Sequence, residues 1–496
     1  DYSKYPLIVF NDITYFPMTY SGCRYLGLES TWKGNQEGLL VDATGVTAAH
    51  NPYTLSARNG RSYTAKVVTL PVTVNGKAVD NSKEQYPLLS FRDITYFPMT
   101  WKYGVEEFGW EYNFEREHGL VIKSGNVKLE QTAISKDRPR EEEFSAFAGK
   151  KSTCVLVKNG YVYYDNNKGE IVQAPLSDPS KTKKMYQLER RSYGDDRLYN
   201  MHNLYEENGK AMLYFHSGGA VMGSDHRIEL NSDGSIRQIQ SSYFDTAAIG
   251  DKLFMYWMGH APGPGNLRMQ ESDAAETVAL GSPDYWYYSL NYSSTALGGV
   301  PRFALFGNQL YVRAAKVISG VAGDVKLADT AIYKVNIDTN EVTRVSNAPG
   351  SVNLGQIDGD HLYYLSQGNV YKIFLQDGNE SFVGKAEGLP ESEIKFAIMG
   401  GKFYYTKEDK QLYTLGNDAT LNPHAELLSM NITGDNQEYL ACTFKESADT
   451  RYRIMLFDRA GKVVFKTSDC GSNVIVEGNT VYFYNITTEN VSSGKI

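Results

Sequence analysis

Cysteine is scarce in this chain, and no sequence-local metal motif is present. The 496 residues include four cysteines, at positions 23, 154, 442 and 470, which are too few and too scattered for a disulfide framework. This spacing is equally compatible with two alternatives for Cys442 and Cys470, namely one disulfide bond between them or two separate buried thiols. The eight histidines form no HxH or HExxH pair and no CxxC occurs, so we expect no metal ion and no cofactor.

Long apolar runs and an excess of positive charge are absent as well. No uncharged apolar run reaches about 18 residues, the minimum for a helix that crosses a bilayer, so we expect no transmembrane segment. The 50 basic and 58 acidic residues give a formal net charge of −8, which argues against nucleic acid as the main partner. Proline is infrequent, with 16 residues, whereas 37 tyrosines and 45 glycines favour a fold rich in β-sheet.

A duplicated segment lies near the start of the chain. Residues 5–20 (YPLIVFNDITYFPMTY) and 86–101 (YPLLSFRDITYFPMTW) are identical at 12 of 16 positions with an offset of 81. Each copy predicts a small α+β unit, in which a short strand ends at a proline that also opens a helix. In the second copy an Asn-Gly hairpin over 72–79 comes first, and short strands over 110–114 and 119–122 follow. The spacing i, i+4 and i+7 predicts one apolar helical face, formed by Trp101, Val105 and Phe108.

The elements of the second copy are a VNGK hairpin, a Tyr-Phe-Pro-Met step, a Gly-Trp-Glu strand and a Gly-Leu-Val-Ile strand, in this order. This order resembles the copper amine oxidase N-terminal-like domain. That family occurs, often in tandem, in secreted and surface proteins of Gram-positive bacteria. The resemblance implies two stalk-like modules, over residues 1–50 and 51–123. It does not imply amine oxidase activity, because the chain offers only Asn291-Tyr292-Ser293 in place of the Asn-Tyr-Asp/Glu cofactor motif and has no HxH copper pair.

A second repeat begins near Cys154. Eight times a glycine turn leads into a short Tyr-rich strand, and successive glycines are 34 to 57 residues apart, close to the roughly 40–50 residues of a four-stranded propeller blade. The pattern, clearest over 352–384, resembles the propeller repeats of bacterial surface proteins of the TolB-like or low-density-lipoprotein-receptor type. We therefore expect a mainly β chain, in which two small α+β modules precede a β-propeller over residues 151–496. The eight glycines are Gly160, Gly209, Gly250, Gly307, Gly359, Gly400, Gly434 and Gly478.

Two blade counts remain open. The eighth unit has only two clear strands before Ile496, so the eight-bladed ring that we favour needs outer strands from elsewhere. The stretch 127–134 (VKLEQTAI), within the connection over 124–150, is the candidate for this closing strand. Seven blades with a loose tail are the alternative. The charged run 136–143 predicts a linker that proteases cut near Arg138 or Arg140.

Four long insertions in the second to fourth units predict the binding region, since propeller loops of this length often carry function. They cover 216–226, 257–268, 282–300 and 314–331. An aromatic surface for sugar rings or peptide side chains would consist of Trp257, His260, Tyr285, Trp286, Tyr288 and Tyr292. A metal-binding or acid–base group at the channel mouth would combine His216, Asp225, His226 and His260. The alternatives are aromatic rings that alternate into the sheet core and histidines that are solvated in loops.

No GxSxG, Walker or paired-carboxylate motif is present, so the sequence gives no sign of an enzyme. We expect an extracellular or cell-wall-associated bacterial protein, its signal peptide removed, whose propeller binds a cell-wall glycan, a peptide or a surface protein. The alternative is a propeller hydrolase or lyase for polysaccharide, and a third interpretation is a structural spacer. A His/Asp pair or two carboxylates at the channel mouth would favour hydrolysis, whereas hydroxyls and aromatic rings alone would favour binding.

Overall fold

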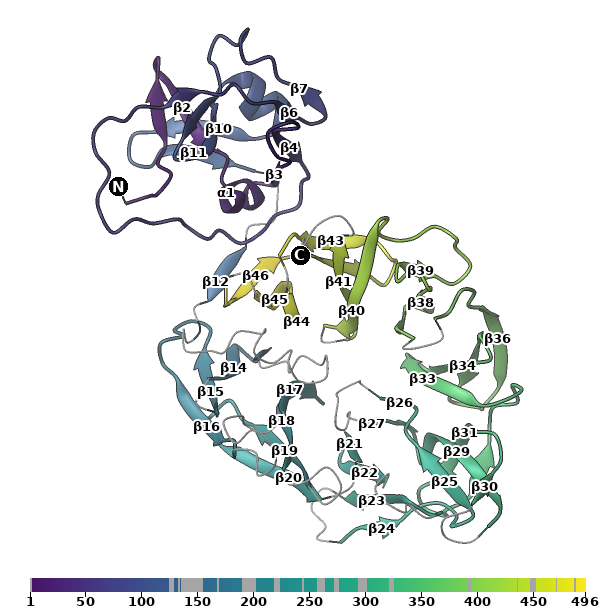
Figure 1. Ribbon diagram of the computed structural model, residues 1–496. Coiled ribbons are helices and arrows are strands. Elements are labelled where there is room, and N and C mark those ends of the chain that lie inside the picture. The colour runs from purple at the N-terminus through teal and green to yellow at the C-terminus, as the bar shows by residue number, and fades with distance from the viewer. Residues whose placement is uncertain are drawn as a thin grey trace.

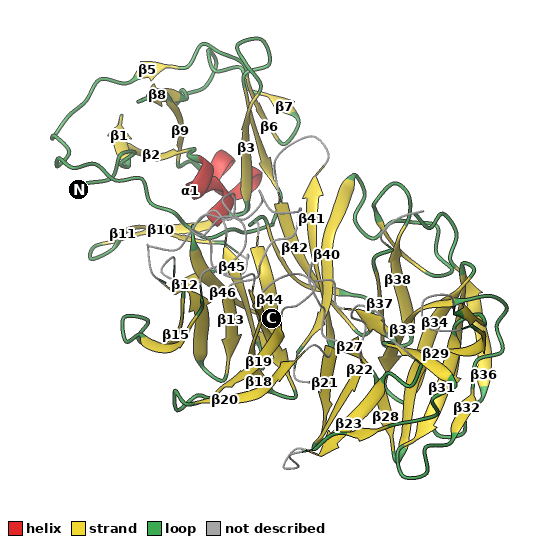
Figure 2. Ribbon diagram, turned by 60° about the horizontal axis from the view of Figure 1, so that its bottom comes forward, coloured by secondary structure: helices red, strands yellow, loops and turns green. Residues whose placement is uncertain are grey.

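Strands dominate the structure (Figure 2). The computed structural model describes residues 2–124, 129–132, 134, 155–166, 169–189, 202–217, 224–242, 245–256, 264–271, 276–292, 301–320, 325–390, 394–434, 436–446, 452–469, 471–485 and 488–496. These residues contain two short helical segments, α1 (Tyr20–Tyr25) and the π-helix η1 (Trp101–Glu107). Within this part of the chain, no helix is long and apolar enough to cross a membrane. The chain is therefore mainly β, as expected.

The two copies of the N-terminal repeat share one sheet. Its order is β1-β2-β9-β8-β5, built from β1 (Ile8–Phe10), β2 (Ile13–Pro17), β9 (Ile94–Pro98), β8 (Leu89–Phe91) and β5 (Lys66–Val67). In the β2–β9 pair, Phe16 lies opposite Phe97, which is its own equivalent 81 residues later, and Tyr15 lies opposite Pro98. A local two-fold axis therefore passes between the two phenylalanines, and the expected modules 1–50 and 51–123 meet in one continuous sheet.

The two hairpins of this sheet turn in the same way. The β1–β2 hairpin turns at Asn11-Asp12 and the β8–β9 hairpin turns at Arg92-Asp93, and all four residues have a positive φ, between 49° and 61°. Positive φ at both central positions is the type I′ geometry that matches the twist of a two-residue hairpin. The duplicated sequence therefore repeats the turn type as well as the strands.

A second sheet joins the two copies again. Its order is β3-β4-β6-β7, with β3 (Leu28–Trp32), β4 (Leu39–Ala43), β6 (Val72–Val74) and β7 (Lys77–Ala78), and the hairpin of β10 (Glu111–Glu115) and β11 (Gly119–Lys123) follows η1. β4 and β6 are parallel, so the Asn-Gly hairpin that precedes the second copy completes the sheet of the first. One hydrophobic cluster combines Cys23 and Val41 with Val74, Phe97 and Trp110. The N-terminal residues therefore form one packed module.

The helix after Pro98 does not present the apolar face that its spacing predicts. Trp101 is 67% exposed, while Tyr103 and Phe108 are buried. The N–H of Phe108 donates to the carbonyl of Tyr103, five residues earlier, which is the π-helical pattern. This wider turn moves the buried face away from the i, i+4, i+7 row of an α-helix, and for that reason the prediction for Trp101 was wrong.

The remaining strands form radiating sheets around a common centre, a β-propeller (Figure 1). Among the described residues, eight sheets of three or more strands lie around this ring, and we number them blades 1 to 8 in chain order. Blades 1 to 3 consist of β13 (Val155–Lys158), β14 (Tyr161–Asp165), β15 (Glu170–Pro175) and β16 (Lys183–Gln187); β17 (His202–Glu207), β18 (Lys210–Ser217), β19 (Ser224–Leu230) and β20 (Ile236–Ser242); and β21 (Asp245–Ile249), β22 (Lys252–Tyr256), β23 (Leu267–Glu271) and β24 (Val278–Ala279).

Blade 4 is the widest, because its long central strand is paired along both edges. It consists of β25 (Tyr285–Tyr288), β28 (Ala304–Phe306), β29 (Gln309–Ser319), β30 (Lys326–Leu327), β31 (Ala331–Asn336) and β32 (Val342–Arg344), and a separate pair is formed by β26 (Asn291–Tyr292) and β27 (Pro301–Arg302). Blades 5 to 7 consist of β33 (Val352–Asp358), β34 (His361–Ser366), β35 (Asn369–Phe374) and β36 (Glu380–Lys385); β37 (Phe396–Met399), β38 (Lys402–Thr406) and β39 (Leu412–Thr414); and β40 (Ala425–Thr433), β41 (Tyr439–Glu446), β42 (Tyr452–Asp458) and β43 (Val463–Thr467).

The eight Tyr-rich strands that the sequence predicts are the second strands of the eight blades, namely β14, β18, β22, β29, β34, β38, β41 and β45 (Thr480–Asn485). Their aromatic side chains fill the interfaces on both sides of a blade. In β14, Tyr163 packs in a cluster with Leu204 of blade 2, while its neighbour Tyr164 packs with Val491 of blade 8. A strand buried on both faces in this way explains the continuous runs of apolar and aromatic residues.

Blade 8 closes the ring with a strand from the other end of the propeller. Three of its strands, β44 (Gly471–Glu477), β45 and β46 (Asn490–Lys495), come from the C-terminal residues, one more than the sequence suggests. The outermost strand is β12 (Glu130–Thr132), which pairs antiparallel with β46. It lies within the stretch 127–134 from which we expected a closing strand. Arg138 and Arg140 of the expected linker lie outside the described residues.

The N-terminal module lies against the rim of the ring, next to β43 and β46 (Figure 1). The hydroxyl of Thr467 donates to the carbonyl of Thr47 at 2.6 Å, and the N–H of Ser468 donates to the same carbonyl at 2.7 Å. Ala49 joins a hydrophobic cluster with Phe465 and other residues of blades 7 and 8. The module is therefore packed on blades 7 and 8 rather than held at a distance by a linker.

Candidate functional site

Histidines, acids and a serine gather at the ends of strands in blades 1 and 2. In an antiparallel blade, the second strand ends on the face where the first strand begins. His202 begins β17, Ser217 ends β18 and Ser224 begins β19, so these residues of blade 2 lie on one face of the ring. Asp165, which ends β14 of blade 1, lies on the same face. This is the face that carries the connections between blades.

Asp225 is the centre of a hydrogen-bond network on one side of the β18–β19 hairpin. The hydroxyl of Tyr214 donates to Oδ1 of Asp225 at 2.8 Å, and Nδ1 of His216 lies 2.8 Å from the same oxygen. His216 lies directly opposite Asp225 in the register, and Tyr214, two residues earlier, points to the same side of the sheet. The side chains of His216 and Asp225 are 20% and 16% exposed, so this network is ordered by its own contacts and remains accessible to solvent.

Ser217 and His226 form a second pair on the opposite side of the same hairpin. The Oγ of Ser217 lies 2.7 Å from Nε2 of His226. The imidazole of His226 stacks on Phe215, with ring centroids 4.5 Å apart and an angle of 7° between the planes. Burial lowers the pKa of His226, and Asp225 and Glu189 act in the opposite direction. A neutral imidazole next to a serine hydroxyl can accept its proton, so this pair has the geometry of a base and a nucleophile.

A third pair bridges blades 1 and 2. Nε2 of His202 lies 3.1 Å from Oδ2 of Asp165, and the two side chains are 2% and 6% exposed. Oδ1 of Asp165 has no hydrogen-bond partner among the described residues. Sequence reasoning missed this pair, because the polar triplet 165–167 is typical of a hairpin turn and nothing in the sequence near His202 indicates its partner. The signal that could have identified this pair is position along the strands. His202 begins the first strand of blade 2 and Asp165 ends the second strand of blade 1, so both lie on the same face of the ring.

Three residues of the predicted aromatic surface lie in a strand and not in a loop. Tyr285, Trp286 and Tyr288 lie in β25, which pairs with residues 313–316 of β29. Tyr285 packs edge-on against Tyr333 at 5.1 Å, within the cluster between blades 3 and 4. Burial raises the pKa of Tyr288, in keeping with a half-buried ring. A strand partner therefore holds these three residues in a blade, where each is partly buried, and their role in a ligand surface stays a prediction.

Three further expectations fall partly or wholly outside the described residues. Trp257 and His260 are not described, and of Tyr292 only the backbone, in β26, is described. Of the group predicted at the channel mouth, His216 contacts Asp225, whereas His226 lies on the opposite side of the same hairpin. In the described ranges, no three His, Cys, Asp or Glu side chains are placed to hold a metal ion. Cys442 is a buried free thiol, and Cys470 lies outside the described residues.

Comparisons with known proteins find similarity in backbone structure only. No protein-family model matches the chain, including for the region 1–123, and no curated protein matches it in sequence. Dipeptidyl peptidase 4 of Porphyromonas gingivalis is similar with a TM-score of 0.42 and 9% identity, over 72% of this chain and 62% of that chain. The C-terminal WD40 domain of Sif2 has a TM-score of 0.42 and 11% identity, over 74% and 98%. A quinonprotein alcohol dehydrogenase-like protein of Bacteroides thetaiotaomicron has 0.35 and 11%, over 77% and 82%.

These TM-scores are low, so the assignment of a β-propeller rests on the observed ring of sheets and not on the comparisons. The comparisons also carry no argument about activity. The chain spans less than two thirds of the length of the dipeptidyl peptidase chain.

Proposed function

We propose that this chain is a secreted or surface-attached bacterial binding protein. Its ligand, a cell-wall glycan, a peptide or a surface protein, would bind at the ends of β18 and β19 in blade 2. The observation that carries this proposal is the network in which Tyr214 and His216 both contact Oδ1 of the partly exposed Asp225. A carboxylate held on one oxygen is fixed in orientation, and such pre-organised polar groups give a site its specificity.

The second oxygen of Asp225 makes the site suitable for a ligand that donates hydrogen bonds. Oδ2 has no hydrogen-bond partner in the part of the chain that the structure describes. Sugar hydroxyls and peptide N–H groups are donors of the kind that a carboxylate accepts. The N-terminal module lies at the rim of the ring and would hold the propeller at the cell surface, in keeping with the surface proteins that its sequence resembles.

Hydrolysis, as by a polysaccharide hydrolase or lyase, is the second candidate, because Oγ of Ser217 lies 2.7 Å from Nε2 of His226 and a His/Asp pair lies on the same hairpin. Among the described residues, no acid is bonded to the other nitrogen of His226, so the third group that orients a base is not assembled there. Binding therefore stands first.

The test compares Asp225→Asn with Asp233→Asn by calorimetric titration against oligosaccharides, peptides and soluble cell-wall fragments. Asp233 is an acid of the same blade, in the turn between β19 and β20 at the other face, and serves as the matched control. We expect the first variant to lose about tenfold or more in affinity and the second to bind as the unchanged protein. Equal affinities would contradict the site. A loss of turnover in Ser217→Ala, with binding retained, would favour hydrolysis.

A further inference from the structure

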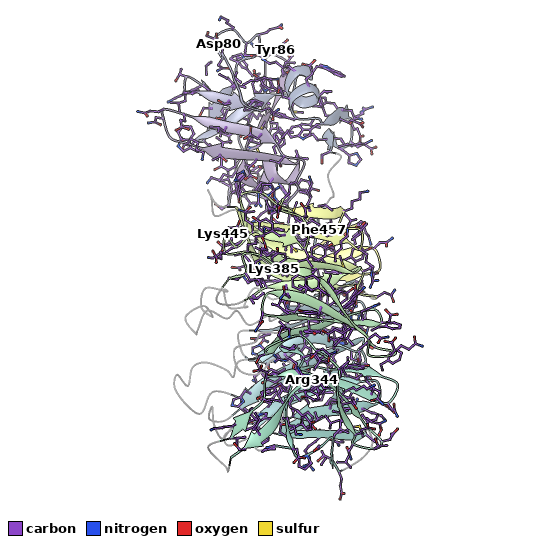
Figure 3. All side chains as sticks on the ribbon, turned by 90° about the vertical axis from the view of Figure 1, so that its right-hand side faces the viewer. Asp80, Tyr86, Arg344, Lys385, Lys445 and Phe457 are labelled. Carbon is purple, nitrogen blue, oxygen red and sulfur yellow. The ribbon has the colours of Figure 1, made fainter. Side chains whose placement is uncertain are left out.

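One segment of the N-terminal module, residues 65–81, covers the edges of two sheets. It contains β5, which pairs antiparallel with β8, and β6, which pairs parallel with β4. At its end, Nδ2 of Asn81 donates to the carbonyl of Leu88 at 3.2 Å, and the N–H of Leu88 donates to Oδ1 of Asn81 at 2.6 Å. Figure 3 labels Asp80 of this segment at the end of the module away from the ring.

The local two-fold axis gives both of these edges a counterpart. β1 corresponds to β8 and β11 corresponds to β4, each with an offset of 81 residues. The sheet order ends at β1 on one side, and β11 pairs with β10 alone, so among the described strands neither counterpart edge is covered. The symmetry of the module therefore predicts one further segment, equivalent to residues 65–81, for these two edges.

The backbone of Val9 points to the outer edge of β1. The type I′ turn closes the hydrogen-bonded pair of Phe10 and Ile13, and such pairs alternate with non-hydrogen-bonded pairs along the ladder. Val9 therefore directs its N–H and its carbonyl away from β2, and neither group has a hydrogen-bond partner in the part of the chain that the structure describes. The residue is 70% exposed, so this edge is accessible.

The same positions of β8 are covered by β5. Ser90, the counterpart of Val9, pairs with β5, and the carbonyl of Leu88 accepts a hydrogen bond from the N–H of Val68 at 3.0 Å. Leu88 is fully buried and packs in a cluster with Val68, whereas its counterpart Leu7 is 45% exposed. A strand added to β1 would cover Leu7 in the same way.

The second edge shows this contrast at two corresponding glycines. Gly38 has a φ of 73° and Gly119 has a φ of 72°. A side-chain carbon placed on Gly38 would stand 1.8 Å from the carbonyl oxygen of Pro71, which accepts a hydrogen bond from the N–H of Leu39. A carbon placed on Gly119 would meet no described atom within 4 Å. The space that Pro71 fills beside β4 is therefore open beside β11.

β11 presents the same backbone groups as β4. Val41 lies opposite Ser30 in the first hairpin. Its counterpart Ile122 lies opposite Tyr112 in the second, so the two hairpins have the same register. The carbonyl of Val41 faces the segment and accepts a hydrogen bond from the N–H of Asn75 at 2.9 Å. The carbonyl of Ile122 faces the corresponding side, where no described residue bonds to it.

We propose that the N-terminal module binds an extended segment of a partner protein, which pairs antiparallel with β1 and then parallel with β11. The partner segment has the chemistry of residues 65–79 (AKVVTLPVTVNGKAV), in which β-branched strands lie on both sides of a proline, and its proline lies against Gly119. Main-chain hydrogen bonds supply the affinity and the apolar side chains the selectivity.

A second copy of this chain does not offer such a segment, because its own residues 65–79 are already paired within their module. The surface lies on the N-terminal module and is independent of the site proposed on blade 2.

The experiment measures fluorescence anisotropy of a labelled, capped peptide with the sequence of residues 65–79, titrated with the full chain. We expect saturable binding. A peptide with Thr73→Pro should bind about tenfold more weakly, because proline removes a main-chain donor from the middle of the added strand.

Two glycine variants of the protein separate binding from folding. Gly119→Ala should weaken the binding about tenfold, because the added carbon stands where the proline of the peptide would lie. The matched control is Gly109→Ala, since Gly109 follows η1 with a φ of 66° and also has no described atom within 4 Å of an added carbon. Both variants carry the strain of a left-handed alanine and should lose similar stability, and only the first should lose binding.

Hydrogen exchange locates the bound peptide, which should slow exchange at residues 7–10 and 119–123 together. No binding of the peptide, equal binding of the Thr73→Pro peptide, equal binding by the two glycine variants, or protection of one edge alone would overturn the proposal. Sedimentation provides a further check. A dimer that forms without peptide and protects residues 7–10 would also overturn the proposal, since it would indicate that β1 pairs with a second copy.

Discussion

Arg24 of the N-terminal module and Asp469, which follows the last strand of blade 7, form a buried ion pair. Nη1 of Arg24 lies 3.7 Å from Oδ1 of Asp469, and the two side chains are 5% and 2% exposed. The other carboxylate oxygen accepts hydrogen bonds from the N–H of Ala49 and from Nδ2 of Asn485 in blade 8, each at 2.7 Å. One carboxylate therefore connects the module, blade 7 and blade 8.

The first prediction is that Arg24→Met destabilises the protein more at pH 7 than near pH 4. Burial raises the pKa of Asp469, and Arg24 acts against this shift. A carboxyl with a raised folded-state pKa contributes most to stability below its unfolded value, and loses this contribution as the pH rises through the folded value. Without Arg24 the buried charge is uncompensated at pH 7, which costs about 3 kcal/mol or more.

Urea unfolding of both proteins at the two pH values measures this difference. Lys83→Met serves as the control, because Lys83 pairs with Asp80 on the surface and its loss should leave the stability unchanged. A deficit of Arg24→Met that is the same at both pH values would contradict the account of a charge held by Arg24.

The second prediction concerns ring closure. A fragment that begins at residue 150 lacks β12, whereas one that begins at residue 124 retains it. Leu129 and Ile134, on either side of β12, are 5% and 6% exposed and pack in clusters that include residues of blade 8. Their loss and the open edge of β46 should destabilise the shorter fragment by about 3 kcal/mol, at roughly 1.5–3 kcal/mol for each buried aliphatic side chain. Equal melting temperatures in calorimetry would contradict this closure.

Local signals in the sequence predict much of this fold. A glycine turn followed by tyrosines is a short-range pattern, and at Gly160 it leads directly to Tyr163 and Tyr164 at the second strand of blade 1. The duplicated hairpins at the N-terminus are local in the same sense. A turn and the strand after it need no distant partner to be recognised.

Features that depend on distant partners could not be predicted. Tyr285 and its neighbours belong to a strand because residues 313–316 pair with them, and the sequence of 282–300 does not indicate this pairing. His202 and Asp165 come together only when blades 1 and 2 pack. The sequence predicts two separate N-terminal modules, because the pairing of Phe16 with Phe97 that joins them arises only in the folded sheet.

The third prediction is that Cys23 and Cys442 resist alkylation in the native protein. Both thiols are fully buried, and burial raises the pKa of Cys23 to about 12 and also raises that of Cys442. Since the thiolate is the reactive form, iodoacetamide should modify both residues only after unfolding. Peptide mass mapping checks this. Native labelling of either residue, or a disulfide between Cys442 and Cys470, would contradict the structure.

The most direct test of the proposed binding site is hydrogen exchange of the full chain with and without soluble cell-wall fragments, oligosaccharides or peptides that bind it. If a ligand contacts the network around Asp225, residues 214–217 and 224–227 should exchange more slowly in its presence, because ligand contacts hold the ends of β18 and β19 closed. Asp225→Asn should abolish this protection. Protection that is confined to other blades, with 214–227 unchanged, would contradict the account.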